Sequence, residues 1–102
     1  NGLACDDDRW RILKIAQDLA AVSDAIKSGV DVRGYLHWSF MDNFEWYTFK
    51  PRFGLVHVDF ETFRRTPKPS AYFYKELIER NGFDGELIRK YLPDVPVFKL
   101  YQ

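Results

Sequence analysis

The sequence predicts an α/β fold in which helices pack against a parallel sheet or barrel. A helical pattern from Arg9 to Ser28 leads directly into an extended run from Val30 to Phe40. Bulky side chains occur on both faces of that run, as in a strand that is covered on two sides. A helix that feeds directly into such a strand is one repeat of an α/β architecture.

The composition is that of a folded chain with balanced charge. The 102 residues are 46% hydrophobic and 18% aromatic, which favours a packed core over disorder. Fifteen basic and 15 acidic residues cancel, so no basic surface for nucleic acid or an anionic membrane is predicted. No apolar run approaches the roughly 20 residues of a membrane span. Without repeats or linkers, residues 1–102 are expected to form a single unit.

The residue types that hold metals and cofactors are sparse. The lone Cys5 excludes an internal disulfide and a cysteine-based zinc site, and we expect an ordinary free thiol. Asp6, Asp7 and Asp8 precede the first helix, where carboxylates accept hydrogen bonds from free backbone N–H groups. Their place favours helix capping over metal binding. We therefore expect no metal and no cofactor, and balanced charge with one cysteine favours a cytoplasmic location.

The first helix carries one apolar stripe, and the extended run that follows alternates between two faces. The stripe consists of Ile12, Ile15, Ala16, Leu19, Val22 and Ile26. Gly29 ends the helix. In the extended run, one face carries Tyr35, His37 and Ser39, and the other carries Leu36, Trp38 and Phe40.

Residues 41–52 are predicted as an irregular loop and residues 53–60 as a second strand-like run. A turn is expected at Glu61–Thr62. Pro67 and Pro69 interrupt the chain before the next element.

Two helices and an extended tail are predicted for the rest of the chain. The first helix runs from Ser70 to Arg80 and ends at Asn81–Gly82. A short helix is expected near Glu86–Tyr91, and residues 93–102 are expected to lie extended against the body.

The stretch GYLHWSFMDNFEW, residues 34–46, concentrates tryptophans and acidic side chains. Pyranose rings have apolar C–H faces that lie on indole, and hydroxyl edges that hydrogen-bond to carboxylates. Trp38 stands near the carboxyl end of its predicted strand, where sheets and barrels place ligands. Asp42, Glu45 and Trp46 follow within a few residues. The stretch therefore predicts a carbohydrate-binding loop.

Structural alternatives exist for the same side chains. Trp38 is either a stacking platform or a buried core residue. Glu45, between two aromatic residues, either pairs with a cation such as Arg52 or binds the hydroxyls of a ligand. Asp42 and Asn43 are expected to hold the loop through side-chain-to-backbone hydrogen bonds.

The remaining polar residues of the region do not indicate nucleophilic catalysis. His37 and His57 are isolated, and we expect structural histidines with satisfied hydrogen bonds. Ser39 lacks the flanking glycines of a nucleophile elbow.

Several ordered motifs together resemble a known family. Residues 34–46 are followed by Arg-Phe-Gly-Leu at 52–55, Val-Asp at 58–59 and Pro-Lys-Pro-Ser-Ala at 67–71. This series closely resembles the C-terminal part of the retaining β-glycosidases of glycoside hydrolase family 1. Asn1-Gly2 also fits, since the family nucleophile lies in a Thr-Glu-Asn-Gly motif. The match covers the chain except for its tail.

The resemblance implies a fold and a set of binding residues. The family fold is an eight-stranded (β/α) TIM barrel. This chain would supply its C-terminal part, namely the helix after the seventh strand, the eighth strand with its sugar-binding loop, and the closing helix. Trp38 would lie beneath the glycone ring and Glu45 would bind two adjacent hydroxyls. Trp46 would bind a third hydroxyl through its indole N–H, and Phe53 would line the site.

The resemblance also implies an activity that this chain does not complete. Retaining hydrolysis needs two carboxyl groups about 5–5.5 Å apart. In the family the nucleophile immediately precedes the position of Asn1, and the acid/base lies several strands earlier. We therefore expect an inactive isolated chain. Its expected partners are a β-glycoside substrate and the N-terminal remainder of the barrel, in the same polypeptide or as a separate chain.

Of two departures from the family pattern, the first bears on the course of the loop and the second on the substrate. The loop Tyr47–Lys50 is one residue shorter than in many members, which have a glycine after Trp46. Members that act on phosphorylated sugars replace the glutamate with serine, whereas Glu45 here would repel a phosphate. Together with Phe53 it implies a non-phosphorylated glycone such as glucose. The alternatives are a non-catalytic carbohydrate-binding module and a structural fragment.

Overall fold

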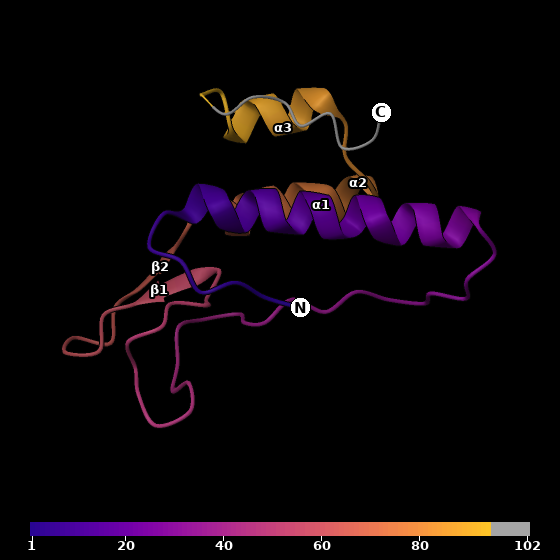
Figure 1. Ribbon diagram of the computed structural model, residues 1–102. Helices are drawn as coiled ribbons and strands as arrows, with labels where there is room; N and C mark the ends of the chain where they lie inside the picture. The colour runs from indigo at the N-terminus through magenta and orange to yellow at the C-terminus, as the bar shows by residue number, and fades with distance from the viewer. Residues whose placement is uncertain (95–102) are drawn as a thin grey trace.

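The computed structural model describes residues 1–94, and their helices form two layers. α1 (Asp8–Lys27) and α2 (Pro69–Arg80) lie side by side (Figure 1). α3 (Gly85–Tyr91) covers the pair on one side, and the extended chain after α1 runs along the other side (Figure 1). Most of the predicted tail, from residue 95 onward, lies outside the described residues.

The three predicted helices are confirmed, and each begins and ends within one residue of the predicted position. These ends were predictable because the residues that cap a helix lie next to its ends in the sequence. The Asp7 carboxylate accepts a hydrogen bond from the Arg9 N–H at 3.1 Å, which confirms the predicted capping of α1. Pro69 occupies the first position of α2, and Asn81 ends it in a left-handed conformation with φ 51°. Asp84 caps α3 through the Leu87 N–H at 2.9 Å.

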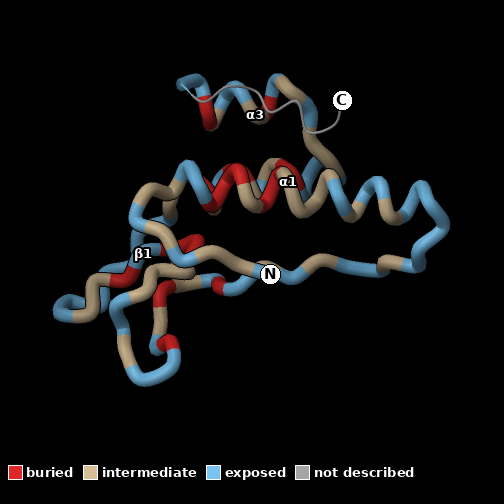
Figure 2. The backbone as a smooth tube through the Cα atoms, viewed as in Figure 1, coloured by how far each residue is buried: buried red, intermediate tan, exposed pale blue. Residues whose placement is uncertain are grey.

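The core lies where the three helices meet. It combines apolar residues of every helix with Leu55, from the chain between α1 and α2, and Leu92, directly after α3. Its members are Ile12, Leu13, Ile15, Ala16, Leu55, Phe73, Leu77, Leu87 and Leu92. Burial is concentrated in the first half of α1, whereas its second half and the chain that follows are mostly exposed (Figure 2). The predicted apolar stripe is therefore buried at one end, and Ile26 at the other end is half exposed.

The predicted strand from Val30 to Phe40 is wrong in this structure. The segment is extended, but its ladder contact with the described residues is a single isolated parallel bridge, between Gly2 and Trp38. A strand needs a neighbour along its whole length, and among residues 1–94 only short pieces pair with this segment. Leu36 is 86% and Phe40 70% exposed, so the bulky faces lack the predicted cover.

The second predicted strand is shorter than expected and belongs to a hairpin. β1 (Val56–Val58) pairs antiparallel with β2 (Arg65–Pro67). The sequence did not predict β2, because Pro67 ends the strand and indicated a break. The turn at Glu61–Thr62 is confirmed, since the Asp59 carboxylate accepts hydrogen bonds from both of its N–H groups at 2.9 and 3.2 Å.

Within residues 1–94, no helix combines the length and the apolar composition that crossing a lipid bilayer requires.

Candidate functional site

The candidate sugar-binding loop starts where the extended segment lies between two other parts of the chain. The Trp38 N–H donates to the Asn1 carbonyl at 2.5 Å, and the N-terminal amino group donates to the Leu36 carbonyl at 2.9 Å. On the other side, the Ser39 N–H donates to the Phe53 carbonyl at 3.2 Å. The Trp38–Ser39 peptide bond is cis. The loop is thereby joined both to the first residues of the chain and to the Phe53 run.

The structure brings Trp38 and Glu45 into direct contact. The Trp38 Nε1–H donates a hydrogen bond to Glu45 Oε1 at 2.8 Å. Trp38 is 53% exposed, so part of its indole surface is open to a ligand, whereas Glu45 is only 8% exposed. Glu45 Oε2 makes no hydrogen bond to the described residues, so it can accept one from a ligand. This pair offers an open aromatic surface beside a fixed carboxylate.

Trp46 lies at the tip of the loop and is 84% exposed. It adopts a positive φ of 43°, and Tyr47 follows with a φ of 72°. The turn is closed by the Glu45 N–H, which donates to the Thr48 carbonyl at 2.8 Å. The turn therefore presents the Trp46 side chain to solvent directly beside Glu45.

Aromatic side chains support the far side of the loop. The ring centroids of Phe44 and Phe49 lie 5.2 Å apart, and those of Phe49 and Phe60 lie 4.8 Å apart. The Arg52 guanidinium lies 4.6 Å from the centroid of Phe60. Phe53, the fourth predicted binding residue, is half-buried next to the start of the loop.

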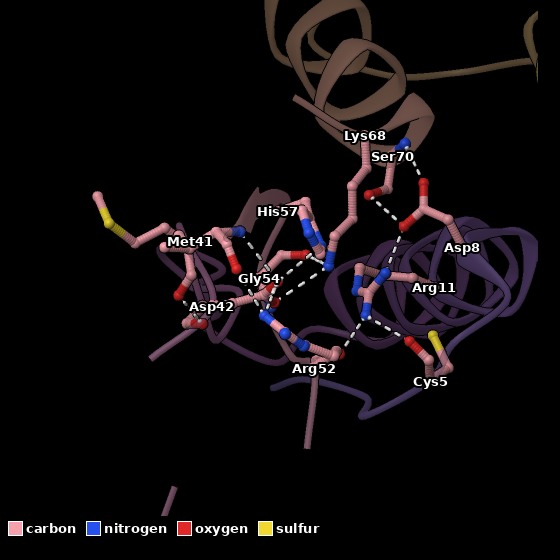
Figure 3. Close-up of polar contacts among 12 residues, drawn as sticks. Cys5, Asp8, Arg11, Met41, Asp42, Arg52, Gly54, His57, Lys68 and Ser70 are labelled. Carbon is pink, nitrogen blue, oxygen red and sulfur yellow. Dashed lines mark hydrogen bonds and ion pairs between the residues drawn. The ribbon is translucent and has the colours of Figure 1, made fainter. Parts of the chain in front are cut away.

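Asp42 is the anchor of the loop and is almost fully buried. Its Oδ1 accepts hydrogen bonds from the Gly54 N–H at 2.9 Å and from Lys68 Nζ at 3.1 Å. Its Oδ2 accepts from Arg52 Nη1 at 3.1 Å (Figure 3) and from the Val58 N–H at 3.3 Å. Burial acts to raise the pKa of Asp42, but the hydrogen bonds from Lys68 and Gly54 outweigh it and hold the pKa below its usual value.

These contacts test one of the two sequence-based interpretations of Glu45, the ion pair with Arg52. Arg52 pairs with Asp42 and not with Glu45, so the predicted alternative of an ion pair at Glu45 is wrong. The predicted loop-holding roles of Asp42 and Asn43 are confirmed. Asn43 Nδ2 donates to the Met41 carbonyl at 2.8 Å and to Ser39 Oγ at 3.1 Å.

The two histidines differ in their surroundings. His57 Nδ1 lies 3.5 Å from Asp42 Oδ2 (Figure 3), in keeping with a structural role. Both ring nitrogens of His37 are buried without a hydrogen-bond partner among residues 1–94, so the prediction of a satisfied histidine is wrong there. Burial lowers the pKa of His37 to about 4, and the ring is neutral at pH 7.

A second buried charge connects the N-terminal segment to the loop region. Arg11 is fully buried and forms an ion pair with Asp8, and its Nη2 donates to the Cys5 carbonyl at 3.3 Å and to the Arg52 carbonyl (Figure 3). The Asp8 carboxylate in turn accepts from the N–H and the hydroxyl of Ser70 at 2.7 and 2.8 Å. One network thus joins α1, α2, the first residues of the chain and the segment that carries Arg52.

Comparison with known proteins identifies the family of this chain. The model of glycosyl hydrolase family 1 matches residues 3–83, which include the loop and most of its anchors. The chain belongs to glycosyl hydrolase family 1. The resemblance seen in the sequence is therefore correct at the level of the family, whose members are TIM barrels.

Relatives that are named for different glycosidase activities match this chain. A β-galactosidase of Sulfolobus acidocaldarius is 45% identical over 100 residues, which are 97% of this chain and 20% of that protein. A 6-phospho-β-galactosidase of Staphylococcus haemolyticus is 51% identical over 74 residues, 72% of this chain and 16% of that protein. The β-glycosidase from Pyrococcus horikoshii has a TM-score of 0.84 and 52% identity over 89% of this chain and 22% of that chain. The chain thus spans about a fifth of the length of these relatives.

Sequence reasoning missed Asp8, Arg11 and Lys68 as determinants of the site region. Each makes its decisive contact with a residue that is distant in the sequence, such as Ser70 for Asp8 and Asp42 for Lys68. The sequence did contain one indication, because Lys68 lies inside the Pro-Lys-Pro-Ser-Ala motif. That motif indicated the family but not the hydrogen bond from Lys68 to Asp42.

A chimeric barrel gives a complete context for experiments. In it, this chain replaces the matching 22% of the Pyrococcus horikoshii β-glycosidase, to which it is 52% identical. This protein is called the chimeric barrel.

Gly54→Ala is expected to destabilise the chimeric barrel by about 3 kcal/mol. A Cβ at this position would lie 2.2 Å from the Asp42 backbone nitrogen and 2.5 Å from the Met41 carbonyl carbon, and backbone atoms cannot yield. The measurement is the midpoint of guanidinium chloride unfolding. Gly34→Ala is the matched control, because a Cβ there meets nothing within 4 Å and should leave the midpoint unchanged. Equal midpoints for both variants would contradict the close approach at Gly54.

Proposed function

We propose that this chain is the C-terminal part of the catalytic (β/α)8 barrel of a retaining β-glycosidase and supplies its glycone-binding loop. On this proposal residues 1–102 act as one unit of that barrel. The complete protein hydrolyses β-glucosides or closely related β-glycosides. The family membership supports this proposal, and so do the β-galactosidase and β-glucosidase names of the relatives.

The observation that carries the proposal is the hydrogen bond between Trp38 and Glu45. The indole N–H fixes one carboxylate oxygen at 2.8 Å, while the indole surface remains half exposed. A pyranose stacked on that surface would direct its equatorial hydroxyls at the neighbouring carboxylate. A charged acceptor that is already held in place forms strong hydrogen bonds without a further loss of side-chain freedom.

Trp46 and Phe53 complete the proposed glycone site. The exposed indole of Trp46 follows Glu45 directly, so its N–H can reach a hydroxyl next to those bound by the carboxylate. Phe53 lies beside Ser39 at the start of the loop and is placed to line the site. In the chain alone Trp46 points into solvent, and the remainder of the barrel would enclose it.

The catalytic carboxylates are proposed to lie outside these residues. The nucleophile would immediately precede Asn1, whose carbonyl accepts the Trp38 N–H at 2.5 Å. That hydrogen bond and the parallel bridge from Gly2 to Trp38 support a nucleophile within one residue of the sugar platform. The acid/base would come from an earlier strand. The proposed partner is accordingly the N-terminal remainder of the barrel, in the same polypeptide or in a separate one.

The role of this chain in the mechanism is to position the glycone. Hydrogen bonds at hydroxyls that do not react supply binding energy that helps to distort the ring toward an oxocarbenium-like transition state. We propose a non-phosphorylated glycone, because a phosphate near the buried Glu45 carboxylate would be repelled. The balanced charge and single cysteine support a cytoplasmic location for the enzyme.

The test compares the isolated chain with the chimeric barrel on an aryl β-glucoside. We expect hydrolysis by the chimeric barrel and none by the 102-residue chain, because both catalytic carboxylates lie elsewhere. Circular dichroism confirms that each sample is folded. Hydrolysis by the isolated chain would point to a different acid pair, and a folded but inactive chimeric barrel would favour a carbohydrate-binding or purely structural role.

A further inference from the structure

We infer that Asp42 is a positioning residue that sets the place of Glu45 in the glycone site. The inference rests on the proposed function, since it assigns Asp42 an effect on sugar binding that is exerted through Glu45. Asp42 is almost fully buried, and its carboxylate is occupied by Arg52, Gly54 and Lys68 (Figure 3), so on this inference it does not contact the sugar.

The contacts of Asp42 hold the loop against residues 54–58, a support that includes β1. The carboxylate accepts hydrogen bonds from the backbone N–H groups of Gly54 and Val58. The backbone N–H of Asp42 donates to the Val56 carbonyl at 3.0 Å. These partners belong to β1 or lie just before it. Glu45 follows Asp42 by only three residues, so a displacement of Asp42 is carried directly to the Glu45 backbone.

The two cations at Asp42 make this anchor sensitive to its charge. Lys68 Nζ also donates to the Gly54 carbonyl at 2.7 Å, and Arg52 Nη1 also donates to the Val58 carbonyl at 2.8 Å. Each cation therefore joins the Asp42 carboxylate to the backbone of the same support. All the hydrogen-bonding partners of the carboxylate are donors, so an asparagine would turn its NH₂ group toward donors on one side and lose those bonds.

Glu45 is buried but makes few hydrogen bonds to other described residues. Its described contacts are the hydrogen bond from Trp38 and the turn bond from its N–H to the Thr48 carbonyl at 2.8 Å, and Trp38 and Thr48 both lie in or beside the same loop. One connection from the loop to the helices runs through Asp42 and Lys68, which directly precedes α2. At the far end of the loop, the Arg52 carbonyl accepts a hydrogen bond from Arg11 of α1. Asp42 thus couples the position of Glu45 to β1 and, through Lys68, to the start of α2.

A double-mutant cycle in the chimeric barrel tests this coupling. The variants are Asp42→Asn, Glu45→Ala and the combination of the two, and the measurement is kcat and KM for an aryl β-glucoside. We expect Asp42→Asn to lower kcat/KM about 30-fold in the parent, and less than about threefold when Glu45 is already alanine. An equal loss in both backgrounds, or no loss in the parent, overturns the inference.

Matched controls separate this result from general damage and from failure of the proposed function. Asp59→Asn changes another carboxylate that accepts two backbone N–H groups, in the turn after β1, and should leave kcat/KM unchanged. If Asp42→Asn does not fold, Lys68→Met replaces it in the same cycle with the same expected pattern. A Glu45→Ala variant with unchanged kinetics refutes the proposed function and, with it, this inference. A damaging Glu45→Ala combined with additive losses refutes the inference alone.

Discussion

Replacing Glu45 with alanine in the chimeric barrel should lower kcat/KM for an aryl β-glucoside by about 100- to 1,000-fold. The carboxylate is buried and held by the Trp38 indole, so its hydrogen bonds to sugar hydroxyls would form in surroundings with little competing water. The loss should fall largely on kcat, because these bonds strengthen as the ring distorts. Steady-state kinetics with the parent and the variant provide the measurement.

Glu61→Ala is the control for this substitution. Glu61 is an exposed glutamate in the turn between β1 and β2, and its removal should change kcat/KM by less than about twofold. A Glu45→Ala variant whose kinetics match those of the Glu61→Ala variant would show that Glu45 does not bind the glycone.

Arg11→Met should reduce the free energy of unfolding of the chimeric barrel by about 3–5 kcal/mol. Arg11 is fully buried, and its removal leaves the Asp8 carboxylate without its ion pair. The carbonyls of Leu3, Cys5 and Arg52 also lose a donor. Guanidinium chloride unfolding, followed by tryptophan fluorescence, measures the change.

Arg9→Met is the matched control on the same helix. Arg9 pairs with Asp7, but its side chain is more than half exposed, and surface ion pairs contribute about 1 kcal/mol or less. The comparison isolates the effect of burial, because both substitutions remove one positive charge from the first turns of α1. If the two variants unfold at the same denaturant concentration, the buried contacts of Arg11 do not stabilise the fold more than a surface ion pair does.

The helices were predictable because their determinants lie within a few residues of one another. Asp7 and Pro69 mark helix starts and Asn81 a helix end, and each acts on backbone groups of its own turn. The strand prediction for Val30–Phe40 failed for the opposite reason. Alternating side chains indicate which residues share a face of a strand. A β-ladder also needs a neighbouring strand to pair with, and residues 1–94 supply only short paired pieces.

The same distinction applies to the candidate site. Trp38, Glu45 and Trp46 lie within nine residues, and their types alone favour a sugar. The hydrogen bond that joins Trp38 to Glu45 requires the loop to fold back on itself, and no pattern in the sequence states this. The anchors are more remote still, since Lys68 lies 26 positions from Asp42 and Ser70 lies 62 from Asp8. Tertiary structure was needed to find them.

A crystal structure of the chimeric barrel with a bound iminosugar analogue of glucose tests the central claim most directly. We predict that the ring lies on the indole of Trp38 and that Glu45 accepts hydrogen bonds from two adjacent hydroxyls at about 2.6–2.9 Å. An analogue bound in the active site with Trp38 and Glu45 out of contact with its ring would contradict the account.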